Sequence, residues 1–395
     1  MLHSGMRVAL TLLALLAALV SFVILGLAIG AFLEGNSSYY AVISSMVWPT
    51  LGPFLFVTAV AACLTGAAVM LSGQRRLGGL TLVLATVATI GAAYILARIG
   101  VAAFAAGAMI DLRASFLLEE MSEPAPDIVE RVQTVGGTDL RAAVYLPTSR
   151  SLPAPVIVYI HGGGFMTGTF TETAADLRWF ADKGWLVVSV EYRLFETGNP
   201  TWELAPGDVT CAFAWTYRNA GRFGGDPSRI ALLGDSAGGN LAINTGFAAA
   251  AGTAKSSCGI EIPTPAAIAV LYPAVDPVSI YADGFPIPGF EPKMLIEGYI
   301  GGSPEEYPDR AEAIFSTTFL TSDAPPTLVV LPEKDSLVVP SGTLDFVAKA
   351  ETAGVDIEMV RIPFANHIFN QVAANSLGNQ IGRSVRLRFL EHHVR

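Results

Sequence analysis

Histidine and cysteine are scarce in this chain. The 395 residues include only five histidines and three cysteines. Lys and Arg are also few, 24 against 34 Asp and Glu, so the net charge is −10. This balance argues against nucleic-acid binding and against a polybasic surface for lipid head groups, because both need clustered cations.

Charge is scarcest in the first 110 residues. A membrane span needs about 20 apolar residues, and the apolar runs at 8–33, 51–71 and 77–97 each qualify. We therefore expect residues 1–110 to be a membrane domain with three transmembrane helices. A signal peptide, cleaved near Ala28 or Gly30, is the alternative for the first run, but that run exceeds the usual 7–15 apolar residues. Residues 39–48 are also apolar, so the second span could start earlier, but Pro49, Pro53 and the aromatic residues fit an interfacial segment better.

The positions of the cations predict the orientation, since short cytoplasmic loops collect Lys and Arg. Arg7 precedes the first run, and Arg75 and Arg76 separate the second from the third, whereas residues 35–50 contain no Lys or Arg. We expect a cytoplasmic amino terminus and, after three crossings, a carboxyl-terminal domain outside the plasma (inner) membrane. Arg98 is expected to reach the outer interface beside an apolar surface helix at 99–110; the alternative is an intramembrane charge with a polar partner.

Two shorter features of residues 1–126 do not indicate a catalytic or metal site. Residues 111–126 are expected to form a solvated acidic linker, which includes Glu119, Glu120 and Glu123, and no histidine or cysteine converges with it to bind a metal. Gly26 and Gly30 form a G-x-x-x-G pattern that fits helix packing within the chain as well as dimerisation, so the oligomeric state stays open.

The most informative motif is Gly234-Asp-Ser-Ala-Gly-Gly239. It follows an apolar strand-like run at 229–233 and opens an Ala-rich helical pattern at 240–251. A serine hydroxyl is a poor nucleophile unless a tight strand-to-helix turn presents it to a base and to donors that stabilise an oxyanion. The motif therefore predicts that Ser236 is a nucleophile on such a turn.

A glycine loop upstream supplies the expected donors. The strand-like run 156–160 leads directly into His161-Gly-Gly-Gly-Phe165, and consecutive glycines expose backbone N–H groups. A flexible linker is the alternative, but a linker does not normally follow a Val/Ile strand at once. We expect the N–H groups of Gly163, Gly164 and Ala237 to form an oxyanion hole.

The general base is found by elimination among the histidines. His3 precedes an apolar span, His161 opens the glycine loop, and His392 and His393 lie in the last turn of a terminal helix, where they suit the helix dipole. His367 remains, in a loop just after the strand-like run 357–362.

The acid that orients this base should follow the preceding strand, 327–331. Asp335 is the candidate, Glu333 is the alternative, and Asp323 lies before the strand and fits less well. The chain order Ser236, Asp335, His367 is that of α/β-hydrolases, and it differs from the orders of chymotrypsin and subtilisin.

Residues 127–395 resemble the hormone-sensitive-lipase-like branch of α/β-hydrolase carboxylesterases, which includes arylacetamide deacetylases. The matching motifs are His161-Gly-Gly-Gly-Phe, Glu191-Tyr-Arg-Leu, Gly234-Asp-Ser-Ala-Gly-Gly, Pro325-Pro-Thr-Leu and Asn366-His-Ile-Phe. The resemblance implies ester hydrolysis through an acyl-enzyme, without a metal or an organic cofactor. Two features depart from the family: Phe195-Glu-Thr-Gly-Asn-Pro replaces the usual continuation of the second motif, and the soluble amino-terminal cap is absent. Both change the expected acyl pocket.

Strand and helix patterns predict the α/β-hydrolase fold: a mostly parallel eight-stranded sheet with helices on both faces and an antiparallel edge. The expected strands are 128–134, 140–146, 156–160, 186–191, 230–233, 267–271, 327–331 and 357–362. Residues 276–316 break this rhythm and are expected to form a cap over the catalytic face rather than an ordinary surface loop. Cys63 is expected to pack within the second span. An oxidising compartment would permit a Cys211–Cys258 disulfide, but spacing leaves the pairing open.

The sequence thus predicts a membrane-anchored serine carboxylesterase that hydrolyses short-chain or lipid-like acyl esters. One alternative is an acyltransferase or deacetylase acting on cell-envelope lipid or glycan, in which an acceptor hydroxyl can replace water. Another is a catalytically silent binding protein on the same scaffold, but such proteins usually lose a triad residue.

Overall fold

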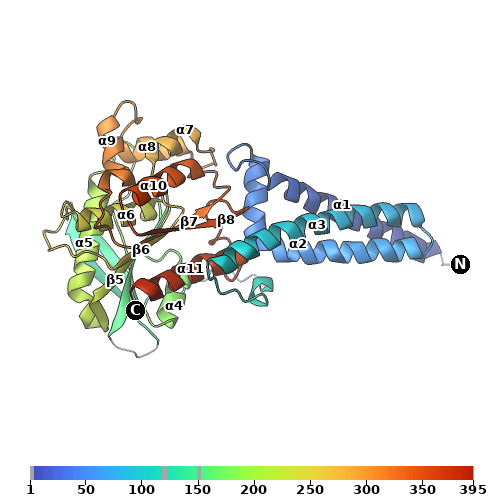
Figure 1. Ribbon diagram of the computed structural model, residues 1–395, viewed down its shortest axis with the longest axis horizontal. Helices are drawn as coiled ribbons and strands as arrows, with labels where there is room; N and C mark the ends of the chain where they lie inside the picture. The colour runs from blue at the N-terminus through green and yellow to red at the C-terminus, as the bar shows by residue number, and fades with distance from the viewer. Residues whose placement is uncertain (1–3, 118–122, 149–152, 395) are drawn as a thin grey trace.

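The computed structural model describes residues 4–117, 123–148 and 153–394, and it has two parts (Figure 1). A stalk of three long helices carries the amino terminus at its far end, and an α/β domain contains the carboxyl terminus. His3 and the linker residues Glu119 and Glu120 lie outside the described residues.

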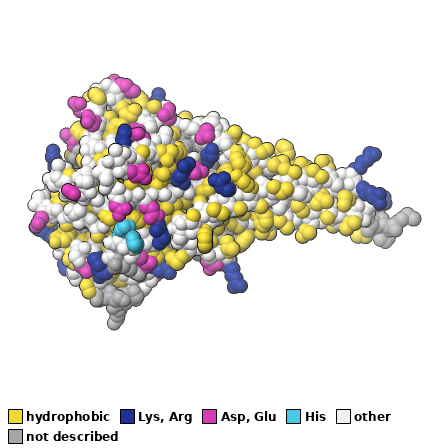
Figure 2. Space-filling view, in the orientation of Figure 1, with side chains coloured by type: hydrophobic (Ala, Val, Ile, Leu, Met, Phe, Trp, Pro, Cys, Tyr) yellow, Lys and Arg dark blue, Asp and Glu magenta, His cyan; other side chains and the backbone are white. Residues whose placement is uncertain are grey.

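The stalk consists of α1 (Ser4–Gly30), α2 (Tyr39–Leu71) and α3 (Arg75–Ala105). Each is long and apolar enough to cross a bilayer. The face of the stalk that Figure 2 shows is mostly hydrophobic, with Lys and Arg at the tip farthest from the α/β domain. Helix α3 runs without a break through Arg98 to Ala105, so the expected separate surface helix at 99–110 is wrong. Arg98 is exposed and donates a hydrogen bond to the hydroxyl of Tyr94 (3.1 Å).

Helix α2 has two differently directed parts. Its first turns, residues 39–50, run across the end of the stalk, and the remainder runs along the stalk (Figure 1). Pro49 and Pro53 lie inside the helix at this bend, and a proline ring removes one helical hydrogen bond and clashes with the preceding turn. We call residues 39–50 the crossing segment.

Small residues let the stalk helices approach closely. A Cβ on Gly30 would lie 2.1 Å from Oγ of Ser44, and one on Gly66 would lie 2.6 Å from the backbone nitrogen of Leu82. The carbonyl of Gly26 accepts a hydrogen bond from the hydroxyl of Tyr40. The G-x-x-x-G face of α1 therefore packs against α2 of the same chain.

The α/β domain is built on one eight-stranded sheet of order β1-β2-β4-β3-β5-β6-β7-β8. Strands β1, β2 and β4 pair antiparallel, and the others pair parallel. This confirms the predicted fold class. The strands are β1 (Ile128–Val135), β2 (Thr138–Tyr145), β3 (Ala154–Ile160), β4 (Leu186–Val190), β5 (Gly225–Asp235), β6 (Ala267–Leu271), β7 (Thr327–Pro332) and β8 (Ile357–Ile362).

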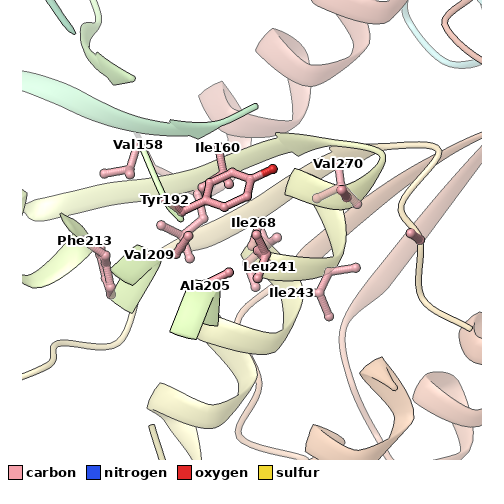
Figure 3. Packing of buried hydrophobic residues seen from close by; sticks show 14 of the residues in the cluster. Val158, Ile160, Tyr192, Ala205, Val209, Phe213, Leu241, Ile243, Ile268 and Val270 are labelled. Atoms are coloured by element: carbon pink, nitrogen blue, oxygen red, sulfur yellow. The ribbon is translucent and has the colours of Figure 1, made fainter. Parts of the chain in front are cut away.

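Helices cover both faces of the sheet because alternate strand residues point to opposite sides. Val156, Val158 and Ile160 of β3 belong to one buried cluster, and Ile157 and Tyr159 belong to another. The first cluster packs against α5 (Leu204–Asn219), α6 (Ala237–Ala250) and α10 (Pro340–Thr352); Figure 3 shows its contacts with α5 and α6. The second packs against α4 (Ala174–Asp182) and α11 (Leu377–His393), and it continues into the stalk.

Residues 276–316 contain three short helices, α7 (Pro277–Asp283), α8 (Pro292–Ile300) and α9 (Pro308–Ile314). Each begins with a proline in its first turn, where the missing N–H costs no hydrogen bond. The ring of Tyr299 in α8 stacks on Phe165 of the glycine loop, with ring centroids 3.8 Å apart. This segment therefore lies against the loop expected to hold the oxyanion.

Cys211 of α5 and Cys258 form a disulfide, with their Cα atoms 5.6 Å apart. The structure thus shows the Cys211–Cys258 pairing, which the spacing in the sequence left open. Cys63 is a free cysteine in α2, with its sulfur 3.5 Å from the hydroxyl of Thr89 in α3.

Candidate active site

Ser236 occupies the tight turn between β5 and α6. Its backbone has φ 55° and ψ −120°, a left-handed conformation that a serine adopts only where its surroundings enforce it. A Cβ on Gly238 would lie 2.1 Å from the carbonyl oxygen of Ile160, and one on Gly234 would lie 2.3 Å from that of Gly238. The glycines of the motif are thus required by close backbone contact.

The three predicted site residues meet at this turn, although they are far apart in the chain. Nε2 of His367 lies 3.0 Å from Oγ of Ser236, and Nδ1 of His367 lies 2.8 Å from Oδ2 of Asp335. All three side chains are buried. The other carboxylate oxygen of Asp335 accepts the N–H groups of Leu337 (3.0 Å) and Val338 (2.8 Å), which fixes the carboxylate in place.

Glu333, the alternative acid, and His161, the histidine of the glycine loop, each contact residues other than Ser236 and His367. The carboxylate of Glu333 pairs with Arg361 at 2.9 Å. His161 is buried, its ring stacks on Tyr192, and its Nδ1 lies 2.8 Å from the carbonyl oxygen of Gly162. Burial lowers the pKa of His161 to about 4, so its imidazole is neutral near pH 7.

The glycine loop is held beside Ser236. Gly163 and Gly164 have φ values of 100° and 61°, which favour glycine. The hydroxyl of Tyr192 donates to the carbonyls of His161 (3.0 Å) and Gly162 (3.2 Å). Because these carbonyls are engaged by Tyr192, the loop has a fixed conformation, which an oxyanion hole requires.

A cavity of about 300 Å³ opens at Ser236 and His367. Its walls come from the glycine loop, from Ile287 and Phe290 between α7 and α8, and from Val42 and Met46 of the crossing segment. The contribution of α2 to the cavity was not predicted. The apolar run at 39–48 before the second span was the only signal for it.

A buried ion pair next to Ser236 was also not predicted. Nη1 of Arg386 in α11 lies 2.8 Å from Oδ1 of Asp235, and both side chains are only 2% exposed. Burial of Arg386 lowers the pKa of its guanidinium. The negative charges of Asp235 and Asp176 have the larger combined effect, so the pKa lies above its ordinary value. The pair joins the turn at Ser236 to α11.

Replacing Arg386 by methionine should therefore destabilise the α/β domain by about 3–5 kcal/mol, because Asp235 would keep a buried, unpaired charge. Thermal unfolding of the full-length protein in detergent, followed by tryptophan fluorescence, measures this change. The double variant Asp235→Asn/Arg386→Met removes both charges and should lose less stability than Arg386→Met alone. An equal or larger loss in the double variant would contradict this account of the pair.

The eight-stranded sheet, together with the strand-to-helix turn at Ser236, has the α/β-hydrolase fold. The profile of the family described as BD-FAE matches residues 143–349, more than half of the chain. The chain therefore belongs to the BD-FAE family, and its resemblance to hormone-sensitive-lipase-like carboxylesterases is confirmed.

Individual esterases agree with this assignment. Carboxylesterase NlhH of Mycobacterium tuberculosis is 38% identical over 128 residues, which are 31% of this chain and 40% of that protein. Esterase LipQ of the same species is 26% identical over 56% of this chain and 51% of its own length. The chain thus spans about half or less of the length of these two relatives.

Solved structures share the fold of the α/β domain. A structure described as bacterial heroin esterase has a TM-score of 0.58 and 25% identity, covering 70% of this chain and 87% of its own. The apo form of Thermogutta terrifontis esterase 2 has a TM-score of 0.56 and 23% identity, covering 69% of this chain and 96% of its own. The latter identity is too low to support more than the fold.

Proposed function

We propose that the protein is a membrane-anchored serine carboxylesterase. Ser236 attacks the ester carbonyl, and His367 accepts the serine proton and passes it to the departing alcohol. Asp335 holds the imidazole in the tautomer that presents Nε2 to the serine. Water then attacks the acyl-enzyme, with His367 again as general base, and releases the carboxylic acid and free Ser236.

One observation carries this proposal: the continuous hydrogen-bonded path from Asp335 through His367 to Ser236, with distances of 2.8 and 3.0 Å. A nucleophile bonded to a base, and a base oriented by a third group, are the geometric signs of covalent catalysis. The N–H groups of Gly163, Gly164 and Ala237 are the proposed oxyanion donors.

Hydrolysis of 4-nitrophenyl acetate by the full-length protein in phosphatidylcholine vesicles tests the activity. We expect nitrophenol and free acetate to be released in equal amounts, because water takes the acyl group. No release of either product would contradict the proposal. Nitrophenol release without acid, dependent on an added sugar or lipid alcohol, would instead identify an acyltransferase.

The helices α1, α2 and α3 are the proposed anchor, with the amino terminus in the cytoplasm. Arg7 lies near the start of α1, and Arg75 and Arg76 begin α3. Lys and Arg side chains gather at the tip of the stalk farthest from the α/β domain (Figure 2). Cations of short loops are retained on the cytoplasmic side, so the catalytic domain belongs on the outer side of the plasma (inner) membrane.

This orientation predicts that alkaline phosphatase fused after Arg395 is active in cells. It also predicts that a protease added outside intact cells, after permeabilisation of any outer layer, cleaves the α/β domain. A fluorescent green-protein fusion at the same position is the control for the opposite orientation. Fluorescence from the green-protein fusion, together with an inactive phosphatase fusion, would place the α/β domain in the cytoplasm and contradict this orientation.

A further inference from the structure

We propose that the crossing segment of α2 forms the acyl-binding wall of the active site and that the substrate is a lipid ester drawn from the adjoining membrane leaflet. This inference rests on the proposed esterase function and names its substrate class. The membrane domain would then select the substrate as well as anchor the enzyme.

The crossing segment contributes apolar side chains to the catalytic cavity. Val42 and Met46, one helical turn apart, line it together with Ile287, Phe290 and Leu337. Residues four apart lie on the same face of a helix. One face of the crossing segment therefore completes an apolar wall beside Ser236, which suits a hydrocarbon chain.

Ser45, on the same segment, holds the loop of the catalytic histidine. Nδ2 of Asn366 donates to Oγ of Ser45 at 2.8 Å. Oδ1 of Asn366 accepts hydrogen bonds from the N–H of His367 (2.7 Å) and from the N–H and hydroxyl of Ser336 (both 2.9 Å). Because Ser336 adjoins Asp335, this one buried amide links α2 to the loops of both the base and the acid.

The loop between α1 and α2 adds further contacts to the same loops. Glu34 pairs with Lys334 at 3.5 Å, and a Cβ on Gly35 would lie 2.0 Å from the carbonyl oxygen of Lys334. Asn36 donates to the carbonyl of Asp283 at 3.0 Å. This loop thus fits closely between the acid loop and the end of α7.

The position of the crossing segment favours substrate access from the bilayer. It runs across the end of the stalk, between the three apolar helices and the α/β domain (Figure 1). Tyr39, Tyr40 and Ile43 on it are exposed, and aromatic residues are typical of the membrane interface. Ile368 lines the cavity and is itself exposed, as is nearby Val372. Ile368 thus belongs both to the cavity wall and to the exposed apolar surface, which gives a lipid chain an apolar path to Ser236.

The size of residue 46 should decide which acyl chains are accepted. Met46→Trp should lower the ratio of kcat/KM for 4-nitrophenyl decanoate to that for the acetate by about tenfold or more, since a filled hydrophobic pocket rejects extra methylenes. Met46→Ala should raise the same ratio. Leu64→Trp is the matched control: it lies on the same helix, is exposed and does not line the cavity, so its ratio should equal that of the wild type.

Ser45 is a positioning residue, and its variant should behave differently. Ser45→Ala should lower kcat for both esters by a similar factor with little change in KM, because His367 is held less precisely. Ser45→Thr keeps the hydroxyl and should restore the rate. A change in the decanoate-to-acetate ratio, or no recovery with threonine, would contradict this role.

The lipid source is tested with dioleoylglycerol in phosphatidylcholine vesicles that contain the full-length protein. The wild type should release oleate, and the rate of oleate release by Met46→Trp should be lower by about tenfold or more. Wild-type protein that cleaves nitrophenyl acetate but releases no oleate would overturn the membrane source. Suppose that both Met46 variants keep the wild-type decanoate-to-acetate ratio of kcat/KM and still react with a fluorophosphonate. The claim that the crossing segment forms the acyl-binding wall would then be wrong, and the esterase proposal would be unaffected. Wild-type protein that takes up no fluorophosphonate would instead overturn the proposed function itself.

Discussion

Ser236→Ala should abolish the hydrolysis of short-chain nitrophenyl esters, with a fall in kcat on the order of 10⁴- to 10⁶-fold. The hydroxyl is the only group within 3.0 Å of Nε2 of His367 in the described site that can form an acyl-enzyme. Removing it leaves at most the weaker catalysis provided by oxyanion donors and substrate binding. Initial rates with 4-nitrophenyl acetate measure the loss.

Expression and membrane insertion of Ser236→Ala should equal those of the wild type, because the substitution removes a single buried oxygen. Ser228→Ala is a suitable control, since Ser228 is exposed and its hydroxyl donates to Oδ1 of Asp226 at the start of β5. Wild-type rates in the Ser236→Ala variant would show that another residue is the nucleophile.

Asp335→Asn should lower kcat by about 10⁴-fold, since an amide cannot hold the imidazole in the tautomer that the mechanism needs. The amide oxygen can still accept the N–H groups of Leu337 and Val338, which Oδ1 of Asp335 accepts in the wild type. The loop should therefore keep its conformation while activity falls. Rates with 4-nitrophenyl acetate and near-ultraviolet circular dichroism separate the two effects.

Glu333→Gln is the matched control two residues away. Glu333 pairs with Arg361, and its side chain is 28% exposed, so this variant should keep nearly all activity, because exposed ion pairs contribute about 0–1 kcal/mol to stability. The opposite ranking of the two variants would assign the orienting role to Glu333.

Local patterns were sufficient to predict the sheet and the motif positions. Strands β3, β4, β6 and β7 are short apolar runs, and the turn at Ser236 needs glycine at position 238 because a Cβ there would lie 2.1 Å from the carbonyl oxygen of Ile160. The histidine could be found by elimination because the chain has so few. The strand and turn signals lie within about ten residues of sequence, where period and turn chemistry determine structure.

Tertiary contacts across long separations could not be predicted in the same way. Ser45 and Asn366 are 321 residues apart, and Asp235 and Arg386 are 151 apart, so no local pattern links them. Helix α2 begins at Tyr39 and continues through Pro49 and Pro53, because surrounding packing maintains a helix that proline alone would end. The same packing brings an apolar stretch expected at the membrane interface into the catalytic cavity.

The most direct test of the central claim is to locate the residue that a fluorophosphonate modifies. Full-length protein in vesicles is treated with the reagent, digested and analysed by tandem mass spectrometry. The account predicts one stoichiometric adduct, on Ser236, which is lost after prior treatment with a slowly hydrolysed ester. An adduct on a different serine, or an unmodified Ser236 in protein that hydrolyses esters, would contradict it.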